Sequence, residues 1–398
     1  MASPFSPTPA VYRLSLLIAL LGLLAVTLMA SSGVMLRSRS PELALRLAPW
    51  DARTAARRSQ ELLIGNAEDQ RRAELLAKRS LARDPTAIAA VVTLAFLDEV
   101  NGRHAEALRR FTYAEWLSRR HLPNELWWIE YGVSENDIPL ALRHYDIALR
   151  GIVQAPDILF PVLGPALAQP AVRAELVKVL AGKPAWKAPF LQWLVVNGVE
   201  THGAAALFME MRRSGQPASQ TLEGRLEQVL VQERDYDTAW RVYQAHDPRA
   251  RRDRSRDETF ASVQVERASP FDWNVIDERG GTTISRSSGY EALSFTTTPT
   301  SAGVLARQLQ LLPSGFYRLT ADTKVEGITS AVRPHWELAC IDGRPLGRAG
   351  LDGKLEQGGR MSVPADCAAQ WLQLVSDAGD TQEGVSGTVR RVLLAPEQ

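Results

Sequence analysis

Two cysteines, Cys340 and Cys367, are the residues of this chain whose type and placement most directly predict covalent chemistry. They are the only cysteines among 398 residues, and both fall in a C-terminal region of alternating apolar and polar residues. Such alternation is typical of β-strands, with Cys340 ending one strand and Cys367 beginning another. We expect a disulfide that closes the intervening loop and adds roughly 3 kcal/mol of stability. The alternative is a pair of buried free thiols.

No other set of residues forms a catalytic or metal-binding motif. The six histidines are scattered, without an HExxH pattern or a histidine–cysteine cluster. A phosphate-binding loop ending in GKS or GKT and a GxSxG nucleophile motif are also absent from the sequence. We therefore expect no enzyme, no metal and no cofactor, although a glycosidase stays open because its two carboxylates need no fixed spacing. With 46 Lys+Arg against 45 Asp+Glu, we expect no nucleic-acid partner.

An uncharged apolar run, residues 14–36, predicts a membrane-spanning helix after a cytoplasmic N-terminal tail, residues 1–13. The run contains 23 residues, and about 20 apolar residues suffice to cross the hydrocarbon core of a bilayer. The alternative is a cleaved signal peptide whose small-residue end lies near Ala30. The run is longer than the apolar core of a signal peptide, roughly 7–15 residues, which favours an uncleaved anchor.

The charges near this run and the cysteines disagree about the side of the membrane that holds the body of the protein. Arg13 precedes the run, whereas Arg37, Arg39 and Arg46 follow it, so the positive-inside rule by itself places the body in the cytoplasm. A disulfide, in contrast, persists in an oxidising compartment. We expect a single-pass protein of a bacterial inner membrane with a periplasmic body, and a cytoplasmic body is the alternative.

A helical region, residues 42–246, repeats small residues at a spacing of 34. Apolar residues recur there at positions i, i+3, i+4 and i+7, which is typical of amphipathic helices. The repeated small residues are Ala73, Ala107 and Ala141, and later Ala205 and Ala239. A small residue lets two antiparallel helices approach closely, and a larger residue one turn later fills the gap to the next helix. The spacing therefore predicts stacked helical hairpins.

This pattern resembles the tetratricopeptide repeat. The clearest unit runs from Ile88 to Leu122, with Gly102 in the turn and Ala107 and Phe111 in the second helix. Pro156, Pro161, Pro165 and Pro170 crowd together within residues 151–185, which break the register, so we expect about five hairpins that are degenerate in the middle. The alternative is an α-helical solenoid or bundle without repeat ancestry. The resemblance implies an array that binds a peptide or protein partner without catalysis.

Two adjacent tryptophans, Trp127 and Trp128, are the candidates for the protein-binding groove. Adjacent residues of a helix point about 100° apart, so we expect one of the two rings to be partly exposed. Most other tryptophans of the helical region are expected in the core. After this region, residues 247–260 carry five arginines and four acidic residues in near balance, which predicts a charged, solvated linker.

The C-terminal region, residues 261–398, predicts roughly eight short strands and an antiparallel sandwich of the jelly-roll type. Its entrance Pro270–Trp273 and its hairpin Leu312–Leu319 resemble carbohydrate-binding modules of the galactose-binding type. The resemblance implies aromatic platforms that stack on sugar rings. The available platforms are Trp273, Tyr290 and Trp371, whereas Trp336 alternates with apolar residues and is expected in the core.

These features together predict a multidomain α plus β protein with a transmembrane helix. We expect a non-catalytic, membrane-anchored scaffold that holds a protein partner through its helical solenoid. By analogy with the fold, its setting would be bacterial envelope polysaccharide assembly or export. The alternative is a carbohydrate-binding protein that acts through its sandwich, with the helical region as a spacer.

Overall fold

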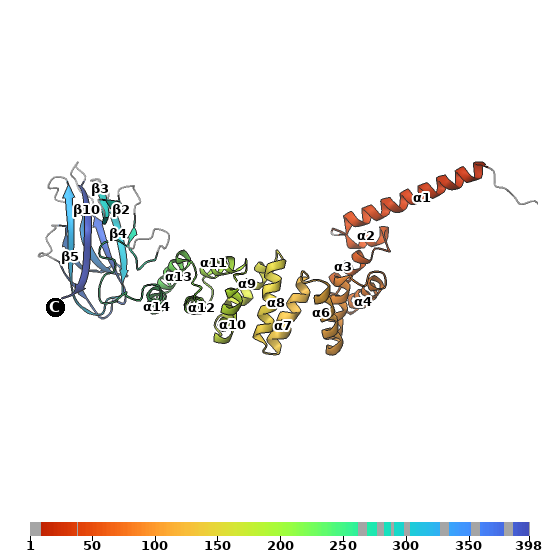
Figure 1. Ribbon diagram of the computed structural model, residues 1–398, viewed down its shortest axis with the longest axis horizontal. Helices are drawn as coiled ribbons and strands as arrows, with labels where there is room; N and C mark the ends of the chain where they lie inside the picture. The colour runs from red at the N-terminus through yellow and green to blue at the C-terminus, as the bar shows by residue number, and fades with distance from the viewer. Residues whose placement is uncertain are drawn as a thin grey trace, which may run out of the picture. The chain divides into compact units, whose positions relative to one another are not determined.

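The structure is a computed structural model, and it describes residues 9–37, 39–261, 269–276, 282–287, 290–297, 303–326, 334–351, 359–377 and 385–397. The chain is a multidomain α plus β protein, with helices first and two antiparallel sheets in the C-terminal part (Figure 1). It divides into two compact units, residues 1–159 and 160–398. The described helices are α1 (Pro9–Leu36), α2 (Pro41–Leu47), α3 (Ala52–Leu62), α4 (Ala67–Leu81), α5 (Ile88–Val100), α6 (His104–Leu117), α7 (Leu122–Ser134), α8 (Ile138–Gly151), α9 (Ala155–Ala166), α10 (Pro170–Ala181), α11 (Lys187–Asn197), α12 (Thr201–Arg213), α13 (Gln220–Gln232) and α14 (Tyr236–His246).

Helix α1 contains the apolar run of the sequence. Within it, Leu16–Leu36 has a mean hydropathy of 2.2, and only 6% of the 18-residue window that defines this span is buried. By length and composition, Leu16–Leu36 is able to cross a membrane, and it is the one helix among the described residues with this property. An apolar helix whose side chains find no protein core is consistent with a membrane anchor.

The first unit stacks its helices as three hairpins, α3/α4, α5/α6 and α7/α8. The predicted small residues Ala73, Ala107 and Ala141 are all buried at the contacts between these helices. Gly132 shows how close the approach is, because a Cβ there would lie 2.8 Å from the backbone nitrogen of Ala141. The large residue Phe111 is fully buried one turn after Ala107, as the 34-residue spacing predicts.

The proline-rich segment that we expected to break the register of the repeat contains the boundary between the two units, which falls within α9. The backbone stays helical there: α9 contains Pro161 and Pro165 in its interior, and α10 starts with Pro170 at its N-terminus, where a missing N–H is tolerated. Helices α10, α12 and α14 then pack one against the next, and α13 pairs with α14. Among the described helices, five successive pairs pack as hairpins, namely α3/α4, α5/α6, α7/α8, α11/α12 and α13/α14, whereas α9 and α10 do not pair closely. The prediction of about five hairpins with a degenerate middle is therefore confirmed.

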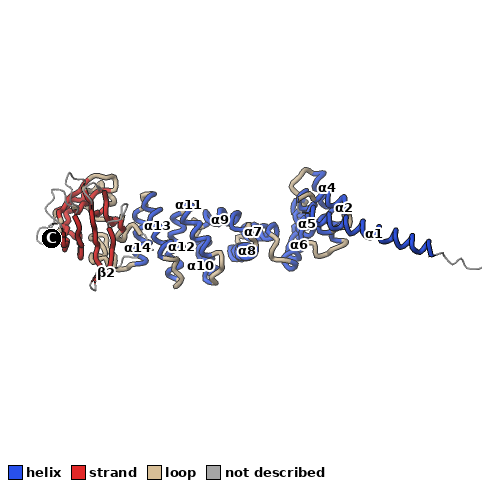
Figure 2. Tube along the Cα trace, turned by 90° about the horizontal axis from the view of Figure 1, so that it is seen from above, coloured by secondary structure: helices blue, strands red, loops and turns tan. Residues whose placement is uncertain are grey.

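Two five-stranded antiparallel sheets form the C-terminal part, which Figure 2 colours red. One has the strand order β1-β4-β9-β6-β7 and the other β2-β3-β10-β5-β8. The described strands number ten, where we expected roughly eight: β1 (Asn274–Val275), β2 (Thr282–Ser287), β3 (Tyr290–Thr297), β4 (Gly303–Gln310), β5 (Gly315–Glu326), β6 (His335–Cys340), β7 (Pro345–Gly350), β8 (Arg360–Val363), β9 (Gln370–Ser376) and β10 (Val385–Pro396). Apolar residues of both sheets meet in one core, so the sheets form a sandwich.

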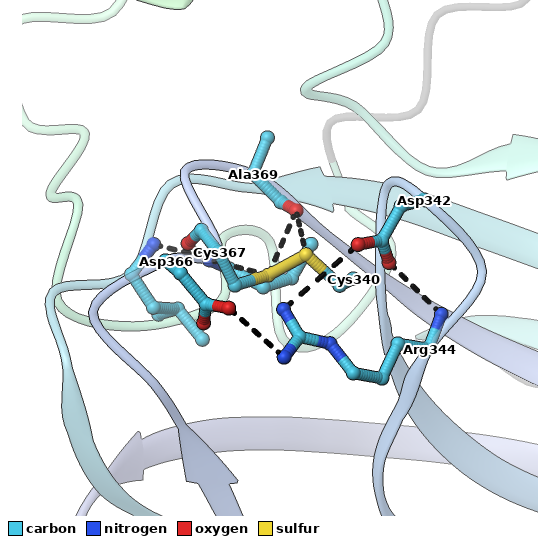
Figure 3. Close-up of a disulfide and its surroundings, with 8 residues drawn as sticks. Cys340, Asp342, Arg344, Asp366, Cys367 and Ala369 are labelled. Carbon is cyan, nitrogen blue, oxygen red and sulfur yellow. Dashed lines mark hydrogen bonds and ion pairs between the residues drawn. A yellow bond between two sulfur atoms is a disulfide. The ribbon is translucent and has the colours of Figure 1, made fainter.

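A disulfide joins Cys340 and Cys367, as predicted (Figure 3). Cys340 ends β6 and Cys367 lies in the turn before β9, and their Cα atoms are 5.8 Å apart. Both residues are 3% exposed. An ion pair between Arg344 and Asp366, 3.0 Å apart, flanks the bond from the same two turns. The disulfide therefore ties the end of one strand of the sheet to the entrance of its neighbour.

Candidate functional site

The structure buries both tryptophans that were predicted to line a groove. Trp127 and Trp128 are 8% and 9% exposed. The ring of Trp127 stacks on Phe111 with a centroid distance of 3.9 Å, and the ring of Trp128 stacks on His144 at 5.2 Å. The prediction was wrong because α6 and α8 each cover one of the two directions in which adjacent residues of α7 point. Both rings are core residues of the first unit.

The three aromatic residues that were predicted to stack on sugar rings differ in their burial. Trp273 is 3% exposed and packs against Trp336 inside the sandwich, so its assignment as a platform was wrong. Tyr290 begins β3, but its side chain lies outside the part of the chain that the structure describes. Trp371 is half-buried on β9, and Arg307 of β4 lies over its ring at 4.3 Å.

The predicted solvated linker is packed at its centre. Arg256 is 6% exposed, and Ser255 and Phe260 are also buried. The guanidinium of Arg256 lies over the ring of Trp240 in α14 at 5.3 Å. It also donates a hydrogen bond from Nε to the backbone oxygen of Phe271, 3.2 Å away. Balanced charge along the sequence does not reveal this burial, because it depends on an apolar helix face and a sheet edge that lie close to the segment only in the fold.

The candidate protein-binding site is an exposed aromatic pair on α6. Trp116 is 80% exposed, the most exposed of the ten tryptophans, and Tyr113 is 39% exposed. Their rings stack with a centroid distance of 6.1 Å and an interplanar angle of 18°. The hydroxyl of Tyr113 donates a hydrogen bond to the backbone oxygen of Pro85, 3.3 Å away, which fixes one ring of the pair. An apolar ring held at the surface in this way is typical of a binding anchor.

Positive charge accompanies this aromatic pair. Arg119 and Arg120 follow α6 and are both exposed, and their side chains make no ion pair with another described residue. Burial lowers the pKa of the neighbouring His121 to about 4, so this imidazole is neutral at pH 7. The chain therefore carries two exposed aromatic rings and, three and four residues after Trp116, two exposed arginines.

The sequence contains a signal for this site that the prediction did not use. The residues one and two turns before Trp116 on the same side of α6 are Thr112 and Arg109, which are both polar. A tryptophan on the polar side of an amphipathic helix is expected to face solvent. Helical periodicity around Trp116 was therefore a better guide than the adjacency of Trp127 and Trp128.

A second candidate surface lies on the outer face of the sheet that contains β4, β9 and β6. Burial lowers the pKa of Arg307, whose guanidinium covers Trp371. On the same face, Glu337 accepts a hydrogen bond from Gln373 at 3.1 Å and another from Arg348 at 2.9 Å. The face thus combines one aromatic ring with planar polar groups. Among the described residues, no group of three or more histidine, cysteine or acidic side chains is arranged to hold a metal ion.

Comparisons with known proteins give little beyond this geometry. No family model matches the chain, and no curated protein matches it. The structure reported as "Functional Characterization of Pseudomonas Aeruginosa pilF" is similar over 57% of this chain and 93% of its own, with 13% sequence identity and a TM-score of 0.27. A TM-score this low carries no argument about function.

Proposed function

We propose that the chain is a non-catalytic, membrane-anchored scaffold that holds a protein partner on the helical hairpins of its first unit. The observation that carries the proposal is the exposed, stacked pair of Trp116 and Tyr113 on α6. Interface anchors are enriched in tryptophan, tyrosine and arginine, and few residues supply most of the binding free energy. The partner is expected to present an acidic segment, because the exposed Arg119 and Arg120 follow Trp116 by only three and four residues.

Replacing Trp116 with alanine is expected to weaken partner binding by about 30-fold or more, since truncating an interface anchor costs about 2 kcal/mol. A photo-crosslinking residue at position 112, which is exposed one turn before Trp116 on α6, first identifies the partner of the full-length protein in its own cells. The affinity of the purified full-length variant for that partner is then measured. Leu75→Ala is the matched control, because Leu75 is 69% exposed on α4 of the same unit. Equal loss of affinity in both variants, or none in Trp116→Ala, contradicts the proposal.

The same proposal places α1 in a bacterial inner membrane and the body of the protein in the periplasm. It is supported by the apolar Leu16–Leu36 segment and by the disulfide, which persists in an oxidising compartment. A reporter that is active only in the periplasm, fused after Gln398 in a Gram-negative host, is expected to be active. Activity of a reporter that works only in the cytoplasm would instead show that the body of the protein lies in the cytoplasm and would contradict this orientation. We propose a role in the cell envelope, including polysaccharide assembly or export, only for the periplasmic orientation. A cytoplasmic body would remove this part of the proposal.

The second candidate function is glycan binding by the sandwich. The observation that favours it is the hydrogen-bonded pair of Glu337 and Gln373 on the same sheet face as the half-buried Trp371, because these planar polar groups suit the hydroxyls of a sugar. Arg307 covers the ring of Trp371, so we expect this guanidinium to move aside when a sugar stacks there. Measuring glycan binding in two variants distinguishes the two candidate functions. Glycan binding lost in Trp371→Ala but kept in Trp116→Ala assigns the sandwich its own ligand.

A further inference from the structure

A cleft of about 410 Å³ lies where α1 meets α2 and the start of α3, all within the first unit. This volume falls in the range of small-molecule sites, roughly 300–1,000 Å³. The elements around it are held closely together, because a Cβ at Gly33 of α1 would lie 2.9 Å from the Cβ of Ala48. The cleft is therefore part of the packed junction at the end of α1, rather than a gap between separate elements.

One wall of the cleft is apolar and continues into the membrane anchor. Val34 lies in the last turn of α1 and is 57% exposed, and Trp50 lies just after α2 and is 44% exposed. The apolar segment of α1 ends at Leu36, so Val34 lies only about 3 Å of helix rise from that end. If α1 spans the membrane, this wall sits at the boundary between acyl chains and headgroups. Tryptophan is enriched at that depth.

The polar lining of the cleft consists of Arg37, Asp51, Arg53 and Asp84, and it holds one arginine tightly and the other only loosely. Arg37 donates hydrogen bonds to Asp51 from Nη2 at 2.8 Å and from Nε at 3.2 Å, and it is 27% exposed. Arg53 is 74% exposed, and its nearest carboxylate among the described residues is Oδ2 of Asp84 at 3.9 Å. Arg53 donates no side-chain hydrogen bond within the described part of the chain. Its guanidinium is available to a ligand.

The charge around the cleft favours an anionic ligand. Residues 37–58 contain six arginines and two acidic residues. Burial opposes ionisation of Asp51, but hydrogen bonds from Thr54 and Arg37 outweigh it and lower the pKa of this carboxyl, so Arg37 is paired. The cleft lining itself is balanced, with Arg37 and Arg53 against Asp51 and Asp84. The positive excess comes from the flanking segment, which adds four further arginines and one further acidic residue, Glu42. Guanidinium groups bind phosphate oxygens through parallel hydrogen bonds.

We propose that this cleft binds the headgroup of an anionic phospholipid, with the phosphodiester on Arg53 and the glycerol and upper acyl chain against Trp50 and Val34. The inference rests on the proposed membrane anchor. A soluble phosphate would use only the polar wall, whereas a phospholipid also covers the apolar wall that continues into α1. The cleft would thereby fix the first hairpin against the membrane surface.

The test uses the full chain in nanodiscs of phosphatidylcholine alone or mixed with phosphatidylglycerol, followed by native mass spectrometry of the lipids that stay bound. Phosphatidylglycerol is expected to be retained in preference to phosphatidylcholine. Arg53→Gln is expected to lower this preference about fivefold, since one arginine near a charged membrane surface contributes about 1 kcal/mol. Trp50→Ala is expected to weaken retention of both lipids. Arg109→Gln is the matched control, because Arg109 is 73% exposed on α6.

The outcomes distinguish the inference from the anchor on which it rests. Failure of the full chain to insert into nanodiscs overturns the anchor itself. Insertion with equal retention of the two lipids, or with no effect of Arg53→Gln, overturns the lipid site and leaves the anchor intact. Displacement of bound phosphatidylglycerol by millimolar glycerol phosphate would indicate a site for free phosphate and would also overturn the proposal.

Discussion

Replacing Arg256 with methionine is expected to lower the free energy of unfolding of the second unit by about 3–5 kcal/mol. The guanidinium donates hydrogen bonds to the backbone oxygens of Phe271 and Leu309 and to Oε1 of Gln310. Methionine has similar length but no donor, so these buried oxygens would be left without a partner. Each unpaired buried acceptor costs about 1–3 kcal/mol.

The surroundings of Arg256 explain why a charge is stable there. Burial lowers the pKa of Arg256, while the hydroxyl of Tyr243 and the carboxylate of Asp272 act in the opposite direction. Tyr243 donates a hydrogen bond to Asp272 at 2.9 Å, which joins α14 to the entrance of the sandwich. The guanidinium also lies 5.3 Å from the ring of Trp240 and 5.6 Å from that of Phe271. Desolvated contacts of this kind contribute about 2 kcal/mol.

Hydrogen exchange of the full-length protein in detergent measures this effect by region. Amides of α14 and β4 are expected to lose at least about 100-fold in protection in Arg256→Met, and amides of α5 to α8 are expected to change little. Arg252→Met is the matched control, since Arg252 also lies over Trp240, at 5.4 Å, but is 38% exposed. Similar small effects of both variants would show that the buried arginine is not needed for this junction.

Removing the disulfide is expected to destabilise the sandwich by about 3.5 kcal/mol. The bond closes a loop with a sequence separation of 27 residues, and the chain-entropy relation gives this value for a loop of that length. Both cysteines are 3% exposed, so a double replacement by alanine leaves two small buried apolar side chains and no unpaired charge. The loss therefore reports mainly the constraint on the unfolded chain.

The measurement compares the full-length protein with Cys340→Ala/Cys367→Ala by denaturant unfolding in detergent, with a probe in each unit. Only the transition of the second unit is expected to shift to lower denaturant. Wild-type protein unfolded and refolded in reductant is the control, and it is expected to match the double variant. Mass spectrometry after alkylation without reduction checks the bond directly. Two alkylated thiols in protein purified from the oxidising compartment would contradict the disulfide.

The sequence alone determined the features that depend on local periodicity. The end of α1 at Leu36 follows from the apolar run, because crossing a bilayer requires about 20 such residues, but the helix begins at Pro9, within the predicted N-terminal tail. The hairpins follow from Ala73, Ala107 and Ala141, since helix packing at a fixed repeat demands small residues at a fixed spacing. Strand alternation placed Trp336 in the core and led to the pairing of Cys340 with Cys367.

Only the tertiary structure decided which aromatic and charged side chains are covered. Trp127 and Trp128 are buried because α6 and α8 lie against both sides of α7, whereas no described element covers Trp116 on α6. Arg256 is buried because α14 and the edge of the sandwich meet around it. Whether a side chain is buried depends on residues that are distant in sequence and pack against it in the fold. A local sequence pattern does not show which distant residues pack there. The fold class was therefore predictable, and the candidate surfaces were not.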